Sequence, residues 1–299
     1  MGEMGRPGGT DSKRESRLLI TGSNGLLGKE ILDRFREEWE ILATDIRDCD
    51  VTNSREFRKV MRGFQPNLVI HCAGYTAVDR AEAEEGSAFD VNVAGTKNVA
   101  RECREHGSLL VTYGTDYIFD GNIRRAYTEE DTANPLSAYG RSKWEAEKAL
   151  KEEGPEHLLI RSQWLYGPHG KNFVFTILDK AKKGESLRVV SDQTGCPTYG
   201  RDLADATYRL LEAGARGTFN FSNEGEVTWY DFASFIIEHA CAGKASLSPA
   251  SSSELPYPAR RPAYSVLDKK KYRETTGHVP RRWEEAALDF LKNECGERP

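Results

Sequence analysis

Short apolar runs alternate with amphipathic stretches over the first half of the chain. The runs lie at 17–21, 41–44, 68–72, 109–113 and 158–160. Their length and unbroken apolar character predict strands that are buried on both faces. After the first run, Leu27, Ile31 and Phe35 recur every four residues, the spacing of one helix face. Strands that alternate with helices predict an α/β fold with a parallel sheet covered on both sides.

Beyond Arg161 this rhythm becomes irregular. Turn-rich segments at 167–170 and 195–198 precede a Ser- and Pro-rich stretch over 246–262, whereas Thr228 begins a capping-box pattern that predicts a helix through His239. We therefore expect a larger domain over residues 17–161 and a smaller lobe over residues 162–299, with some segments of the second half returning to the first domain. Residues 1–16 are rich in Gly, Ser and charge, which predicts a disordered tail.

Charge and cysteine content narrow the classes of partner. Lys and Arg number 42 against 47 Asp and Glu, a formal charge of −5, so the chain has no basic footprint for nucleic acid or anionic lipid. The six cysteines show no Cys-x-x-Cys spacing and no neighbouring His cluster, which argues for reduced thiols and against a structural zinc site. The sequence has no apolar run of membrane-spanning length and no signal-peptide core, so we expect a cytoplasmic protein.

Three glycines mark the junction between the first predicted strand and its helix. Gly22, Gly25 and Gly28 stand in Thr-Gly-Ser-Asn-Gly-Leu-Leu-Gly, where backbone N–H groups and a helix dipole can hold a pyrophosphate. Such a motif alone also fits a simple tight turn, but its place between strand and helix favours a dinucleotide. The prediction is a Rossmann-type, doubly wound parallel sheet with a smaller C-terminal substrate-binding lobe.

The end of the second predicted strand bears on the choice of cofactor. Asp45 lies 17 residues after Gly28, where a carboxylate can accept a hydrogen bond from the adenosine ribose, although a surface turn is an equal alternative. The carboxylate favours NAD because it would repel a 2′-phosphate, yet Arg47 could bind that phosphate. The sequence therefore admits NADPH or NADH.

Tyr139 and Lys143 stand four residues apart, which places them on one face of a helix. A tyrosine with its usual pKa near 10 is a poor acid at neutral pH unless a nearby cation stabilises the phenolate, and Lys143 is placed to do so. Such pairs also occur by chance. Thr115, however, follows the run 109–113, at the sheet edge where folds of this kind bind ligands. Together these residues predict a nicotinamide-dependent carbonyl reductase.

Several blocks of sequence resemble the dTDP-4-dehydrorhamnose reductases, a family of the extended short-chain dehydrogenase/reductases. The blocks lie at 21–28, 73–79, 114–121, 135–143, 161–167, 172–173, 192–198, 228–233 and 261–267. The likeness runs from Arg17 to Leu291. The first and fourth blocks are shared with many related reductases and epimerases, and the later ones narrow the resemblance to this family.

The resemblance implies a role for each matching residue. Tyr139 is the expected proton donor, Lys143 binds the nicotinamide ribose and lowers the tyrosine pKa, and Thr115 hydrogen-bonds the reacting oxygen. The matching cofactor positions are Gly25, Leu26, Leu27, Asp45, Asp50, Val51, Gly74, Tyr75 and Thr76. The candidate substrate contacts are Thr115, Asp116, Trp164, Asn172, Gln193 and Arg261, the last as a pyrophosphate partner. Asp50 is equally a loop carboxylate, Trp164 a core aromatic residue and Arg261 a solvated charge.

The implied activity is reduction of the C4 keto group of a nucleotide-linked 6-deoxy-4-keto-hexose, with dTDP-4-dehydro-L-rhamnose as the first candidate. Two residues depart from the family pattern: Gly114 stands where the family usually has Ser, and Gln163 where it usually has Ser or Thr. The identity of the sugar is therefore less closely defined than the chemistry. A dehydratase would need a second carboxylate where Tyr117 stands. Another dTDP-deoxysugar 4-ketoreductase, an epimerase and a non-catalytic regulatory subunit of the same fold remain alternatives. A homodimer is compatible with the sequence, which does not determine the oligomeric state.

Overall fold

A computed structural model describes residues 16–240 and 245–295 of the chain. All but the last residue of the predicted tail, residues 1–15, therefore lie outside the described residues. The centre of the molecule is a six-stranded parallel sheet with the order β10-β5-β4-β3-β1-β2. In chain order its strands are β1 (Arg17–Thr21), β2 (Glu40–Thr44), β3 (Leu68–His71), β4 (Leu109–Thr115), β5 (His157–Ser162) and β10 (Gly217–Asn220).

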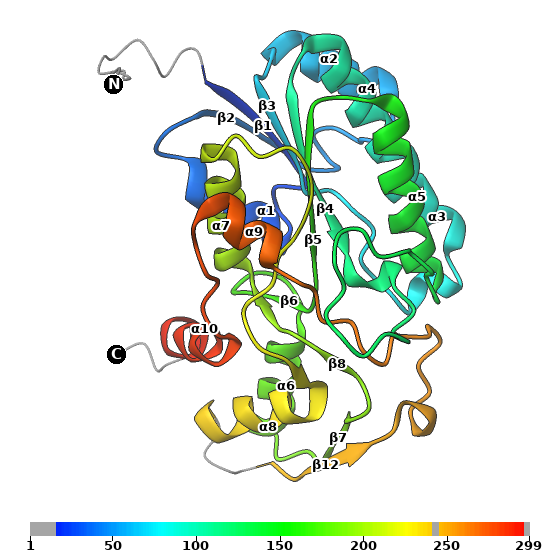
Figure 1. Cartoon of the computed structure of the whole chain (residues 1–299), viewed down its shortest axis with the longest axis vertical. Helices are drawn as coiled ribbons and strands as arrows, with labels where there is room; N and C mark the ends of the chain where they lie inside the picture. Colours follow the sequence, from blue (N-terminus) through cyan, green and yellow to red (C-terminus); the bar gives the residue numbers. More distant parts are fainter. Residues whose placement is uncertain (1–15, 241–244, 296–299) are drawn as a thin grey trace.

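Helices cover both faces of this sheet, as Figure 1 shows. One face carries α1 (Leu26–Phe35), α7 (Gly200–Glu212) and α9 (Lys270–Thr276). The other face carries α2 (Ser54–Phe64), α4 (Thr96–His106) and α5 (Ala138–Glu153), with the short α3 (Glu85–Phe89) beside α5. The fold class and all five predicted strands are confirmed, and the sixth strand comes from the second half of the chain.

Alternation along the strands explains the two layers of helices. Leu18 and Ile20 of β1 pack with the α1 and α7 side, whereas Leu19 between them packs with α2 and α4. On β3, Ile70 likewise packs on the α1 and α7 side, and Val69 packs on the α2 and α4 side. Because successive side chains of a strand point to opposite faces, an unbroken apolar run supplies both cores at once.

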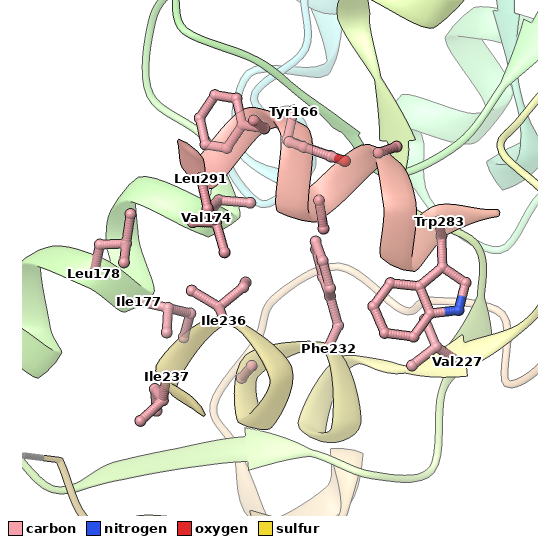
Figure 2. Packing of buried hydrophobic residues seen from close by; sticks show 14 of the residues in the cluster. Tyr166, Val174, Ile177, Leu178, Val227, Phe232, Ile236, Ile237, Trp283 and Leu291 are labelled. Atoms are coloured by element: carbon pink, nitrogen blue, oxygen red, sulfur yellow. The ribbon is translucent and has the colours of Figure 1, made fainter. Parts of the chain in front are cut away.

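The second half of the chain adds a separate core (Figure 2), built around three helices. These are α6 (Phe173–Lys182), α8 (Trp229–Ala240) and α10 (Trp283–Phe290). Short strand pairs frame them: β6 (Leu165–Tyr166) with β9 (Thr198–Tyr199), β7 (Leu187–Val190) with β12 (Leu247–Ala250), and β8 (Thr194–Gly195) with β11 (Val227–Thr228). Single turns of 3₁₀-helix at Arg80–Glu82, Asp116–Ile118 and Ser252–Glu254 and π-helical turns at Asp90–Gly95 and Leu291–Cys295 complete the described elements.

The predicted helix after Thr228 is confirmed as α8. The Thr228 hydroxyl accepts a hydrogen bond from the Asp231 backbone N–H at 3.1 Å and donates to the Asp231 carboxylate at 2.6 Å. These bonds satisfy one of the free N–H groups at the helix start. Among the helices of residues 16–240 and 245–295, none is long and apolar enough to cross a membrane.

Candidate active site

The glycine turn lies between β1 and α1 and has no room for side chains. Gly22 has φ +66°, and a Cβ there would lie 2.5 Å from the backbone nitrogen of Ala73. A Cβ on Gly28 would overlap the carbonyl oxygen of Gly22. Helix α1 begins after Gly25, and no side chain caps it there. The turn thus brings uncapped backbone N–H groups to a surface that a large anion can approach closely.

Asp45 is built into this turn. One carboxylate oxygen accepts from the Asn24 backbone N–H at 3.0 Å and the other from the Ile46 backbone N–H at 2.8 Å. The carboxylate therefore lies beside the glycine turn, where the sequence placed it, with its orientation fixed. Arg47 is exposed two residues further on.

A cavity of about 440 Å³ opens next to the same turn. Residues of the turn, α1, the β2 end and the loop after β6 line it: Ser23, Asn24, Lys29, Leu32, Asp33, Ala43, Asp48 and His169. Lys29 and His169 add positive or ionisable groups that the sequence motif did not identify. Asp50 lies just beyond and accepts from the backbone N–H and the hydroxyl of Thr52 at 2.9 and 2.8 Å, which is a local turn, while Val51 is buried.

Gly74, Tyr75 and Thr76 follow β3 and are held by an asparagine that sequence reasoning missed. Asn92 is 2 % exposed. Its side chain accepts from the Tyr75 N–H at 2.8 Å and donates to the Tyr75 carbonyl at 3.1 Å and the Ser142 hydroxyl at 2.9 Å. It thereby links this loop to α5, one residue before Lys143. The available signal was an isolated amide within the apolar sequence Val-Asn-Val-Ala.

The structure brings Thr115, Tyr139 and Lys143 together at the carboxyl end of β4. Ser137 caps α5 by accepting from the Gly140 N–H at 3.1 Å, which places Tyr139 in the first turn and Lys143 one turn later. The Thr115 hydroxyl is hydrogen-bonded to the Tyr139 phenol. The Lys143 ammonium donates to the Tyr113 carbonyl at 2.6 Å. The predicted triad thus forms one cluster.

Burial is the largest cause of the pKa shifts in this cluster. Burial raises the pKa of Tyr139 to about 12, against the lowering effect of the Thr115 hydrogen bond. Burial lowers the pKa of Lys143 to about 8, against the upward effect of the Glu147 and Cys72 charges. The expected effect of Lys143 on the tyrosine stays a prediction.

Asp116 lies behind Thr115 rather than on an open sugar surface. It is 1 % exposed and accepts hydrogen bonds from the Thr115 hydroxyl at 3.2 Å and the Ser265 hydroxyl at 2.6 Å. Burial raises the pKa of Asp116 to about 7, although both hydroxyl contacts favour its ionised form. The expected sugar contact is therefore a buried carboxyl that joins β4 to the C-terminal segment.

A buried ion pair explains the unusual glycine before Thr115. The Arg161 guanidinium of β5 donates to the Glu147 carboxylate of α5 at 2.8 to 3.2 Å, and both side chains are 3 % exposed. A Cβ on Gly114 would lie 2.7 Å from the Glu147 Oε1 atom and 2.8 Å from the Arg161 Cγ atom. Gly114 thus leaves the space that this pair occupies, directly beside Thr115.

A second cavity, of about 260 Å³, lies on the C-terminal side of the cluster. Aromatic, apolar and basic side chains line it: Tyr117, Phe173, Thr176, Ile177, Lys180, Leu187, Arg188, Val189, Val190, Gln193, Trp229, Tyr257 and Arg261. Two of the predicted substrate residues, Gln193 and Arg261, are among them. Tyr117 reaches from this cavity to Tyr139, with the ring centroids 5.8 Å apart.

The other predicted substrate residues support this cavity without lining it. Trp164 stacks on Trp229 with ring centroids 3.6 Å apart, and its φ of +47° shows a backbone held in a rarely populated conformation. Asn172 caps α6 by accepting from the Phe175 N–H at 3.2 Å and donates to the Gly167 carbonyl at 2.8 Å. Arg261, which does line the cavity, forms a bidentate pair with Asp79 at 2.8 and 3.0 Å.

Metal ligation has no visible basis in the portion of the chain that the structure describes. No group of three or more His, Cys, Asp or Glu side chains there could hold an ion. Cys49, Cys72, Cys103 and Cys196 carry free thiols, and burial raises the pKa of each.

Comparison with known proteins gives a consistent result. The family model described as the RmlD substrate binding domain matches residues 16–295. A dTDP-4-dehydrorhamnose reductase of Aggregatibacter actinomycetemcomitans is 37% identical, covering 93% of this chain and 98% of that protein. One of Mycobacterium tuberculosis is 37% identical, covering 93% of each.

Solved structures agree with this similarity. A dTDP-4-dehydrorhamnose reductase of Clostridium acetobutylicum superposes with a TM-score of 0.89 at 38% identity, over 92% of this chain and 98% of that one. The Bacillus anthracis reductase in complex with NADP gives a TM-score of 0.90 at 36% identity, again over 92% and 98%. A Thermus thermophilus UDP-glucose 4-epimerase complex with NAD, at 22% identity and a TM-score of 0.81 over 94% and 99%, shares the fold.

Proposed function

The chain belongs to the RmlD family of dTDP-4-dehydrorhamnose reductases, and from this we propose that it reduces the C4 keto group of a nucleotide-linked 6-deoxy-4-keto-hexose with NADPH or NADH. The preferred substrate is dTDP-4-dehydro-L-rhamnose. The observation that carries the proposal is the cluster of Thr115, Tyr139 and Lys143 at the end of β4, between the glycine turn and the second cavity.

The cofactor side of the proposal rests on the glycine turn. Side chains at Gly22 and Gly28 would collide with backbone atoms, so the turn is shaped for close approach of an anion. We assign the pyrophosphate to the N–H groups from Gly22 to Gly28, including Leu26 and Leu27 at the start of α1, and the adenosine ribose to Asp45 and Arg47. Asp50 and Val51 then border the adenosine side, and Gly74, Tyr75 and Thr76 border the nicotinamide side.

When bound, the reduced nicotinamide supplies the hydride. Tyr139 donates its proton to the oxygen that becomes the alkoxide, and Thr115 holds that oxygen by a hydrogen bond. Lys143 binds the nicotinamide ribose and supplies a positive charge near the phenolate. The high pKa of Tyr139 keeps its proton available at neutral pH in the free protein.

The second cavity fits the rest of a sugar nucleotide. Lys180 offers positive charge for a diphosphate, and the guanidinium groups of Arg188 and Arg261, paired with Glu254 and Asp79 in the free protein, lie in the same lining. Phe173, Trp229 and Tyr257 offer flat apolar surfaces for a base. Gln193 adds an amide to the lining, Asp116 and Trp164 support the sugar end, and Asn172 fixes the start of α6.

A dehydratase and a non-catalytic subunit of the same fold would place different demands on the residues of this site. Elimination of water would need a carboxylate at position 117, and Tyr117 packs edge-on against Tyr139 there. A non-catalytic subunit would not require an assembled Thr115, Tyr139 and Lys143. A cytoplasmic location and a homodimer stay predictions.

Tyr139→Phe tests the assignment. The variant keeps the ring and removes the proton, so kcat for cofactor oxidation with the keto sugar nucleotide should fall about 10²-fold or more. Cofactor affinity, measured by fluorescence titration, should stay nearly unchanged. Turnover close to the wild-type value would remove Tyr139 from the mechanism.

A further inference from the structure

Reduction consumes one proton for each hydride, so Tyr139 must regain a proton after every turnover. A chain of hydrogen bonds joins its phenol to a carboxyl group: Tyr139 is hydrogen-bonded to Thr115, and Thr115 to the Asp116 carboxyl. Lys143 instead donates to the Tyr113 carbonyl at 2.6 Å. The Ser265 hydroxyl completes the chain by donating to the far oxygen of Asp116 at 2.6 Å.

We propose that Asp116 stores the proton that restores Tyr139 and delivers it through the Thr115 hydroxyl. This inference rests on the proposed reduction, in which Tyr139 gives its proton to the sugar oxygen. It assigns to Asp116 a role in proton supply, beyond the sugar contact expected from the resemblance.

Thr115 has the groups that a relay needs. A hydroxyl has one hydrogen to donate and two lone pairs to accept with. With Asp116 ionised, the Thr115 hydrogen points to the carboxylate at 3.2 Å. With Asp116 protonated, the carboxyl can donate to Thr115 and the Thr115 hydrogen turns to Tyr139. The Tyr117 backbone N–H donates to the same Thr115 oxygen at 3.2 Å, which fixes its position.

The proton transfers balance. The sugar oxygen takes the phenolic proton of Tyr139, and the phenolate takes the hydroxyl proton of Thr115 while that oxygen takes the carboxyl proton of Asp116. The Asp116 carboxylate then takes a proton from water, so one proton enters per hydride transferred. Thr115 and Tyr139 end each cycle as they began it.

The acidities support this direction. Burial raises the pKa of Asp116 to about 7, whereas that of Tyr139 is about 12, so a proton moves favourably from the carboxyl to the phenolate. The titratable groups that face Asp116 are Tyr117 on its own turn and Tyr139 on α5, with Arg261 of the C-terminal segment beyond Tyr117. Neither tyrosine ionises near pH 7, and Lys143, whose pKa is about 8, has no carboxyl group, so an infrared carboxyl band separates its titration from that of Asp116.

Asp116→Asn keeps the shape and one acceptor oxygen but removes the acid. With enzyme in excess, a single turnover uses the proton already on Tyr139, and its hydride-transfer rate should stay within about threefold of wild type, while steady-state kcat should fall by about tenfold or more. Equal losses in both measurements would show that Asp116 only positions Thr115 or the sugar. Wild-type values in both would place the proton supply elsewhere. Either result overturns the proposal.

Ser265→Ala gives a second test that retains the carboxyl. Loss of its hydrogen bond removes a contact that favours the ionised form, so the fall of kcat as pH rises through about 7 should move to higher pH. If kcat of Ser265→Ala fell at the same pH as kcat of the wild type, the relay would be contradicted.

Infrared titration of the free protein makes the test independent of the substrate. A protonated-carboxyl band that disappears as pH rises through about 7 should be present in wild type and absent in Asp116→Asn. Absence of this band in wild type rejects the relay even if the sugar assignment is wrong, and failure of wild type to oxidise the cofactor rejects the proposed function alone.

Discussion

Gly114→Ala should lower both the stability of the protein and its kcat, because the added methyl group would displace a buried ion pair beside Thr115. The new methyl group would lie 2.7 Å from the Glu147 Oε1 atom and 2.8 Å from the Arg161 Cγ atom, closer than carbon atoms normally approach either. Neither neighbour can swing into solvent, since both side chains are 3 % exposed and joined by hydrogen bonds of 2.8 to 3.2 Å. The ion pair must shift, and Thr115, the next residue of β4, must shift with it.

The magnitude follows from two opposing effects. Overpacking a buried site costs about 1–3 kcal/mol, while replacing Gly by Ala at an ordinary backbone conformation gains about 0.4–1 kcal/mol from the unfolded state. The free energy of unfolding should therefore fall by about 1–2 kcal/mol. We also expect kcat to fall, because the Thr115 hydroxyl moves relative to Tyr139.

Urea denaturation followed by tryptophan fluorescence, with kcat measured on the same samples, checks both effects. Gly63→Ala in α2 is the matched control, because beyond its chain neighbours and the nearby backbone of its own helix no atom lies within 4 Å of the added Cβ. That variant should gain up to about 1 kcal/mol and keep its activity. If Gly114→Ala were as stable and active as Gly63→Ala, the packing argument for this glycine would be refuted.

Two further predictions concern the cofactor and the core. If Arg47 binds the 2′-phosphate, Arg47→Ala should raise KM for NADPH and leave KM for NADH nearly unchanged, and equal effects on both would show that the side chain does not discriminate. Burial lowers the pKa of His71 from 6.5 to about 3, so between these values the unfolded chain binds more protons than the folded one. Stability should therefore fall on acidification through this range, by up to about 1.4 kcal/mol per pH unit, and His71→Asn should remove that part of the slope in denaturation curves. If the dependence of stability on pH were the same in His71→Asn as in the wild type, the assignment of this slope to His71 would be contradicted.

The sheet could be predicted because its signal is local. Buried parallel strands are apolar on both faces, so β1, β3 and β4 appear as runs in the sequence. Strand β10 was missed because Gly-Thr-Phe-Asn has no such run, and its place beside β5 depends on tertiary pairing.

The cluster of Thr115, Tyr139 and Lys143 could be predicted because two of its residues have a fixed spacing: Tyr139 and Lys143 lie about one helical turn apart. Its supporting contacts could not, because each joins distant segments. Asn92 reaches the loop at Tyr75, and Ser265 meets Asp116 across 149 residues. The pKa of Tyr139 likewise depends on burial, which follows from the tertiary fold and not from spacing along the chain.

Transfer of deuterium from the cofactor tests the central claim most directly. The substrate is dTDP-4-dehydro-L-rhamnose, and the reduced cofactor carries deuterium at its transferable position. A reductase transfers its hydride once and then exchanges the spent cofactor, so one deuterium should appear at sugar C4 for each cofactor oxidised. Conversion of the sugar without net cofactor oxidation, or deuterium at another carbon, would contradict the account.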